Sequence, residues 1–206
     1  MLAENNVRKG FFEHDQFEAL LKQLPEHVKP VVRFAYVTGW RTRSEILTLQ
    51  WRQVDFHAGE IRPDPGTTKN KEGRVFPITR DLQMILEEQK IKHEQMKQSG
   101  VICPWIFPYN GKPFKSLKTA WKGACVKAGI PWVIPHDFRR TAVRNLVRSG
   151  IPERVAMQMT GHKTRSVFDR YNIVSEGDLQ EAKRKLDSKL GTILGTKGGK
   201  TEGRLG

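Results

Sequence analysis

Apolar residues recur at the helical period of 3.6 residues along most of this chain. The first such segment covers residues 15–24 and ends before Pro25. A second helix is expected to have Pro30 in its first turn and to end at Gly39. A third, short helix is expected at residues 45–49. Further helices are expected after Thr79, from Ser116 to Gly129, over residues 137–149, from Pro152 to Gly161, and after Thr164 or Ser166 with Tyr171 on it.

Residues 51–78 carry a different pattern. Short apolar pieces lie there among Gly, Pro and Asp, which is typical of strands joined by turns. We expect a small three-stranded antiparallel sheet, with residues 70–73 as the turn between its last two strands. Residues 105–107 predict one more short extended piece. The predicted fold class is therefore α+β and mainly α-helical.

The C-terminal end of the chain carries a narrow apolar stripe at helical spacing. It follows Ser175, a residue type that favours helix starts, and its members are Leu179, Ala182, Leu186 and Leu190. This helix could pack on its own domain or dock on another copy. Residues 191–206 are rich in Gly and Lys and predict a disordered tail. The predicted organisation is one domain over residues 1–174, a helix over 175–190 and the tail.

The net charge narrows the class of partner. The 206 residues include 36 Lys and Arg against 22 Asp and Glu, a formal charge of +14. Such an excess favours a nucleic acid, and a membrane surface much less, although some basic chains bind neither. Cys103 and Cys125 are too few for a disulfide framework. No apolar run approaches the ~20 residues of a membrane-spanning helix, so we expect a soluble intracellular protein.

Residues 135–171 contain a spacing that carries chemistry. His136 and Arg139 form a His-x-x-Arg pair on one helical face, a Gly-His pair ends at His162, and Tyr171 closes the segment. A tyrosine with a pKa of about 10 is a weak nucleophile unless cations assist it. The planar fork of arginine binds two phosphate oxygens at once. The pattern therefore favours attack by Tyr171 on a phosphodiester.

This segment resembles the second half of a tyrosine recombinase active site, as found in the phage integrase family, and the resemblance covers roughly residues 9–190. The family's first catalytic arginine follows a Thr-Gly turn and precedes a glutamate. Here residues 38–45, TGWRTRSE, offer both Arg41 and Arg43. We favour Arg41 because the turn sets the direction of its side chain. Glu45 either supports the arginine or is an ordinary helix-surface charge.

Residues 68–78, TKNKEGRVFPI, resemble the β-hairpin that holds the family's catalytic lysine. The resemblance assigns Lys69 to that position, as the acid that protonates the leaving 5′ oxygen, with Lys71 as a rival or a phosphate contact. Arg140 lies about 100° around the helix from Arg139 and is expected to be solvated or to touch the DNA backbone. The residues expected to contact DNA are Arg43, Lys71, Arg140, Lys163 and Arg165.

The resemblance also implies a mechanism on double-stranded DNA. Arg41, Arg139 and His162 would hold the scissile phosphate. His136 would assist proton transfer while Tyr171 forms a 3′-phosphotyrosyl link. No metal, ATP or other cofactor is needed, because the covalent link conserves the energy of the broken bond.

The resemblance also implies a further domain and an assembly on DNA. Family members normally carry an N-terminal clamp on the DNA, so this chain alone is expected to cleave weakly. In relatives the segment after the tyrosine often docks on a neighbouring protomer, which implies a homotetramer on DNA, in the cytoplasm at the nucleoid. Type IB topoisomerase-like relaxation, a non-catalytic DNA-binding remnant and, least favoured, RNA binding stay open as other functions.

Overall fold

The computed structural model describes residues 10–64, 73–172 and 176–193, and the side chains of the last segment over 179–188. The chain divides into two units, Met1–Asn172 and Ile173–Gly206, close to the expected boundary after residue 174. The first unit is mainly helical with a small antiparallel sheet, as predicted.

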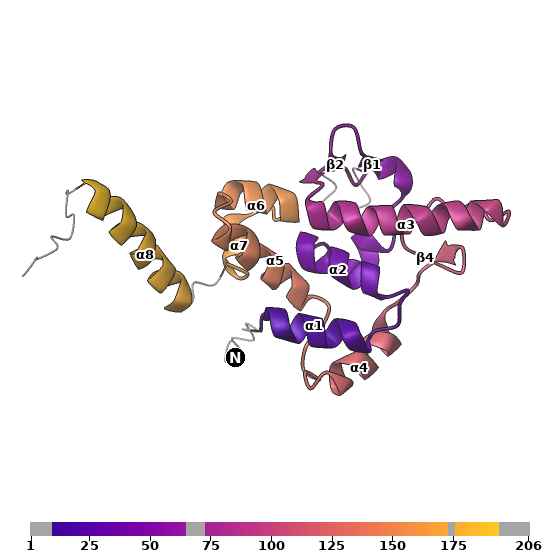
Figure 1. The fold of residues 1–206 in the computed structure, drawn as a ribbon, viewed down its shortest axis with the longest axis horizontal. Helices are drawn as coiled ribbons and strands as arrows, with labels where there is room; N and C mark the ends of the chain where they lie inside the picture. The colour runs from indigo at the N-terminus through magenta and orange to yellow at the C-terminus, as the bar shows by residue number, and fades with distance from the viewer. Residues whose placement is uncertain (1–9, 65–72, 173–175, 194–206) are drawn as a thin grey trace, which may run out of the picture. The chain divides into compact units, whose positions relative to one another are not determined.

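Helices form most of the first unit (Figure 1). Their ends follow the expected signals: the hydroxyl of Thr79 accepts from the amide of Leu82 at 3.4 Å, and Gly39 and Gly161 end their helices with φ of 63° and 72°. The helices are α1 (His14–Gln23), α2 (Lys29–Thr38), α3 (Arg80–Gln98), α4 (Lys118–Lys127), α5 (Asp137–Arg148), α6 (Glu153–Thr160) and α7 (Arg165–Asp169).

Two helical features differ from the prediction. The expected third helix is a single π-helical turn, η1 (Thr42–Ile46), in which the amide of Ile46 donates to the carbonyl oxygen of Arg41 at 3.2 Å. Tyr171 does not lie on a helix. It follows the end of α7 in a turn, where its amide donates to the carbonyl oxygen of Phe168 at 2.8 Å.

The predicted sheet is present, but its strands are short. β1 (Val54–Asp55), β2 (Glu60–Ile61) and β3 (Phe76–Pro77) pair antiparallel in the order β1-β2-β3. The segment begins with a 3₁₀ turn, η2 (Trp51–Gln53), rather than a strand. The expected turn at residues 70–73 falls almost entirely outside the described residues.

A second, unexpected hairpin follows α3. Its strands are β4 (Pro108–Tyr109) and β5 (Lys112–Pro113). Asn110 and Gly111 form the turn between them with φ of 51° and 72°. Asn-Gly is a strong signal for such a turn because both positions need positive φ.

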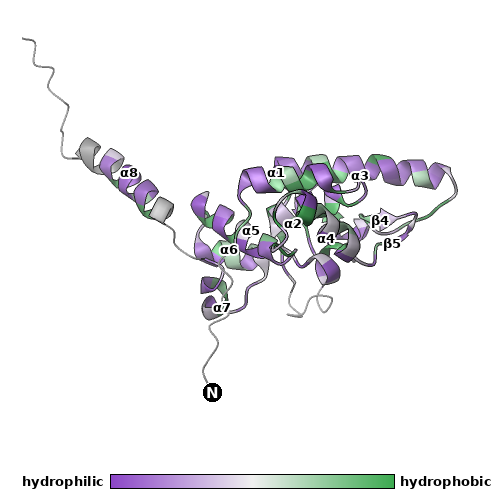
Figure 2. Cartoon of the chain, turned by 90° about the horizontal axis from the view of Figure 1, so that it is seen from below, coloured by the Kyte–Doolittle hydropathy of each residue, from purple (hydrophilic) through white to green (hydrophobic). Residues whose placement is uncertain are grey.

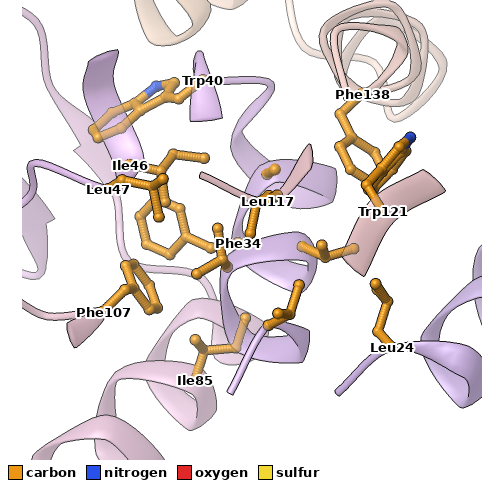
Figure 3. Close-up of a cluster of buried hydrophobic side chains, with 14 of the residues drawn as sticks. Leu24, Phe34, Trp40, Ile46, Leu47, Ile85, Phe107, Leu117, Trp121 and Phe138 are labelled. Atoms are coloured by element: carbon orange, nitrogen blue, oxygen red, sulfur yellow. The ribbon is translucent and has the colours of Figure 1, made fainter. Parts of the chain in front are cut away.

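The apolar core lies between the helices and fixes α2 and α5 side by side. Figure 3 shows Phe34, Trp40 and Phe107 gathered at one end of the cluster and Trp121 and Phe138 at the other. Purple and green segments alternate along α3 in Figure 2, as expected for a helix with one face in the core. Because α2 ends and α5 begins beside this core, both are rigid supports for nearby side chains.

The second unit contains the C-terminal helix, α8 (Glu176–Ile193), which extends three residues beyond the expected end at residue 190. Residues 191–193, expected to be disordered, are therefore helical. Leu179 and Leu186 are 63% and 58% exposed. The rest of the expected tail lies outside the described residues.

Candidate active site

Arg139 is the most firmly held of the predicted site residues. It lies in the first turn of α5 and is only 3% exposed. Its Nε donates to Nε2 of His162 at 3.0 Å, its Nη1 to the carbonyl oxygen of Gly39 at 3.1 Å, and its Nη2 to that of Gly161 at 3.3 Å. Burial, with Arg41 nearby, lowers the pKa of Arg139 to about 10, so it stays a cation at neutral pH.

Hydrogen bonds from neighbouring residues determine which ring nitrogen of His162 carries the proton. The hydroxyl of Thr160 donates to the carbonyl oxygen of Ala156 at 2.6 Å, so it can accept from Nδ1 of His162 at 2.8 Å. Nε2 is then free to accept from Arg139. Burial and the charges of Arg139 and Arg41 lower the pKa of His162 to about 3, which keeps the ring neutral.

His136 contacts the predicted nucleophile directly. Its Nε2 lies 2.9 Å from Oη of Tyr171, and the ring of His162 lies 4.8 Å from the ring of Tyr171 between centroids. Burial and the charge of Arg139 lower the pKa of His136. A neutral imidazole at this distance can accept the phenolic proton.

Arg41, rather than Arg43, joins this cluster through Glu45. Nη1 of Arg41 donates to Oε1 of Glu45 at 2.8 Å, and Arg41 contributes to the lowered pKa values of His136 and His162. Arg43 is exposed. The structure thus favours the first of the two arginines that the sequence left open.

Glu45 is buried and bridges two arginines. Its second carboxylate oxygen lies 2.7 Å from Nη2 of Arg74, a residue that is 6% exposed. Burial alone would raise the pKa of Glu45, but its bonds to Arg74 and Arg41 hold the pKa below the usual value. The predicted supporting role is therefore the one that the contacts favour over a surface charge.

Arg74 lies in residues 68–78, the segment that resembles the family's hairpin, but the sequence prediction assigned it no role. The guanidinium of Arg74 lies 4.3 Å from the centroid of the Trp40 ring, and its Nη1 donates to the carbonyl oxygen of Thr160 at 3.4 Å. Arg74 therefore links the sheet to Glu45 and to the turn before His162. Its place in the hairpin-like segment 68–78 could have drawn attention to Arg74, but no local pattern gives these contacts.

A cleft of about 640 Å³ opens beside the cluster. Arg41, His136 and Arg139 line one part of it, and apolar side chains of Leu47, Trp121 and Val133 line another. Arg43, a predicted DNA contact, also lines the cleft. So do Lys118 and Lys122, two basic residues that the sequence prediction did not include.

The remaining predicted residues fall only partly in the described part of the chain. Lys69 and Lys71 lie outside the described residues. Lys163 is exposed, and exposed Arg165 forms ion pairs with Glu153 and Asp169. Arg140 is 8% exposed, so its expected solvated position is wrong.

Among the described residues, no His, Cys, Asp and Glu side chains gather in a group of three or more that could hold a metal ion. None of the helices described is long and apolar enough to cross a membrane.

The cluster thus combines a tyrosine, a neutral histidine on its hydroxyl, and arginines held in fixed directions. A phosphate is the substrate group that this set suits, because the arginines can stabilise charge on its oxygens while the tyrosine attacks.

Known proteins are similar to this chain in sequence and in fold. The phage integrase family matches residues 10–177. The integrase of Salmonella phage P22 is 28% identical over 203 residues, 92% of this chain and 50% of that protein. Tyrosine recombinase XerD of Neisseria meningitidis serogroup B is 28% identical over 155 residues, 74% of this chain and 52% of that protein. The chain spans about half the length of these relatives.

Solved structures agree on the fold. The crystal structure of XerA recombinase has a TM-score of 0.70 at 20% identity, over 85% of this chain and 63% of that one. The Tn1549 transposon integrase in complex with transposon right end DNA has a TM-score of 0.69 at 15% identity, over 91% of this chain and 68% of that one. Because the family match covers most of the sequence, the chain belongs to the phage integrase family.

Proposed function

We propose that this chain is the catalytic domain of a site-specific DNA recombinase. The observation that carries the proposal is the 2.9 Å contact between Nε2 of His136 and Oη of Tyr171, beside the fixed guanidinium of Arg139. Relatives named integrase and tyrosine recombinase support the same class of reaction. The substrate is double-stranded DNA, and neither metal nor nucleotide enters the reaction.

Cleavage exchanges one phosphoester for another. Oη of Tyr171 attacks the phosphorus as His136 accepts the phenolic proton. The Oη–P bond forms, the bond from phosphorus to the 5′ oxygen breaks, and that oxygen leaves as a 5′-hydroxyl after receiving a proton from Lys69. Attack by a 5′-hydroxyl of a partner strand reverses these steps and reseals the DNA.

The cations divide between binding and charge stabilisation. Arg41 and Arg139 stabilise the negative charge that develops on the phosphate oxygens, since both are held before substrate arrives. His162 positions Arg139 through the 3.0 Å bond that its Nε2 accepts from Nε of the arginine.

Binding of the flanking DNA falls to exposed basic residues. Arg43, Lys118 and Lys122 line the cleft beside the site, and their charges favour a phosphate backbone. The expected contacts of Lys71, Lys163 and Arg165 belong to the same proposal.

The assembly is a homotetramer on DNA, acting at the nucleoid in the cytoplasm. Residues 175–190 supply the exchange between protomers in this proposal. The exposed Leu179 and Leu186 of α8 are its apolar contacts.

The test uses the whole 206-residue chain and a library of random duplexes, each with a nick that traps cleaved strands. A protein–DNA adduct that survives denaturation is expected for the wild type and absent for Tyr171→Phe, which lacks the attacking oxygen. Tyr109→Phe is the control, because Tyr109 is an exposed hairpin residue.

The DNA products of the same reactions then distinguish recombination from topoisomerase activity and from DNA binding without cleavage. Joining of strands between two duplexes supports recombination, whereas relaxation of supercoils alone would indicate topoisomerase activity. Sequence-specific DNA binding without any adduct would overturn the catalytic proposal in favour of a DNA-binding remnant.

A further inference from the structure

Arg140 is a buried cation, and no acceptor for it is found in the described part of the chain. Its side chain is in α5, directly after Arg139, and is 8% exposed. Its Nη1 is buried and makes no hydrogen bond, and no described residue forms an ion pair with it. By contrast, Arg139 donates to three acceptors, and Arg144 on the same helix donates to Glu13 at 2.8 Å and to the carbonyl oxygen of Phe12 at 3.1 Å.

Arg140 also lies beside the ring of the predicted nucleophile. Its guanidinium carbon lies 5.6 Å from the centroid of the Tyr171 ring, and that of Arg139 lies 5.9 Å from the same centroid. Although the two arginines leave the helix about 100° apart, both reach the predicted nucleophile. Both guanidinium groups therefore lie beside the ring of the residue that would carry the phosphate.

Contact with an aromatic ring compensates only part of the cost of burying a charge. An anion would compensate the rest. Among common anions, phosphate matches the planar fork of arginine and can accept two of its hydrogen bonds. A buried cation that lies beside a candidate nucleophile is also a candidate for a functional role.

We propose that Arg140 is an additional catalytic residue, which donates to a non-bridging oxygen of the phosphate that Tyr171 attacks. The contact forms when DNA binds and persists while phosphorus is bonded to Oη. Arg140 thereby adds to the charge stabilisation by Arg41 and Arg139. This inference rests on the proposed function, but its test needs no cleavage.

The test compares wild type with Arg140→Met, which keeps an unbranched side chain over the ring of Tyr171 and removes the charge. Thermal unfolding is followed during titration with inorganic phosphate, at ionic strength kept constant with chloride. We expect the apparent phosphate dissociation constant to rise about tenfold or more, the effect of losing one charge-assisted hydrogen bond. Arg154→Met is the matched control on exposed α6 surface and should bind phosphate like wild type.

Stability without phosphate separates this role from a structural one. Since Arg140 has no acceptor among the described residues, Arg140→Met should then unfold at the same or a higher temperature than wild type. Arg140→Lys, which keeps the charge but not the fork, is the second variant and should lose part of the phosphate affinity. The proposal is overturned if wild type shows no specific phosphate binding, or if both variants bind phosphate as tightly as wild type. Absence of a DNA adduct would instead count against the proposed function.

Discussion

At the scale of single residues, His162 makes stability depend on pH. Burial and the charges of Arg139 and Arg41 lower its pKa to about 3, whereas in an unfolded chain the pKa is about 6.5. Between these values the unfolded state binds the extra proton. His162 therefore costs no stability above about pH 6.5. Below that pH it lowers the free energy of unfolding by up to about 1.4 kcal/mol for each pH unit.

We predict that His162→Gln, which cannot titrate at this position, loses less stability on acidification than wild type does. Urea unfolding near pH 7 and near pH 5 measures the loss in each variant. His136 acts in the same direction, since its pKa is also lowered, so some loss should remain. His57→Gln, at an exposed position, serves as the control and should behave like wild type. Equal losses in wild type and His162→Gln would show that His162 is not the residue responsible.

At the scale of elements, Arg74, in the segment before β3, lies against the end of α6 at Gly161. Its φ is 72°, and a Cβ there would lie 2.3 Å from Nη1 of Arg74. Glycine is needed at this position for its backbone angle and for the space that the guanidinium occupies. The glycine of the Gly-His pair therefore both ends α6 and leaves the space that the side chain of Arg74 occupies.

Gly161→Ala should destabilise the domain by about 2–5 kcal/mol, from backbone strain together with displacement of a buried side chain. Gly150→Ala is a matched control, because Gly150 also has positive φ, 82°, but nothing lies within 4 Å of its added Cβ. Its cost should be only about 1–2 kcal/mol. Urea unfolding measures both, and equal costs would contradict the role given to Arg74.

The elements that the sequence predicted correctly are those with local causes. Periodicity and caps identified the helices, and motif spacing identified His136 and Tyr171, because one short segment of chain carries both. The two-residue strands and the π-helical turn could not be predicted, since packing against the core determines them. The hairpin around Asn110 could have been, from its Asn-Gly pair.

The contacts of the site were less predictable than its members. Arg74 and Thr160 are 86 positions apart in sequence, and the burial of Arg140 depends on where the turn at Tyr171 lies against α5. Helical geometry alone placed Arg140 away from the Arg139 face and so predicted contact with solvent or with the DNA backbone. Tertiary packing brought both side chains to one ring.

At the scale of the whole molecule, assembly and chemistry are separable in this proposal. The residues around Tyr171 belong to the first unit, and α8 belongs to the second. A charge of +14 favours DNA binding by the chain even where protomers do not contact one another. Strand cleavage requires one active site, whereas strand exchange requires several protomers on one pair of DNA sites.

Deletion of residues 175–206 should therefore reduce assembly on DNA while single-strand cleavage on the trapping substrate persists. Sedimentation of protein–DNA complexes measures assembly, and a denaturing gel measures the covalent adduct. Leu179→Ser combined with Leu186→Ser should reproduce the deletion if the apolar side chains of α8 make the contact, because each is more than half exposed within this chain. Gln180→Ser combined with Asp187→Ser, on a neighbouring polar face, is the control. Assembly that is unchanged by the deletion would remove α8 from this role.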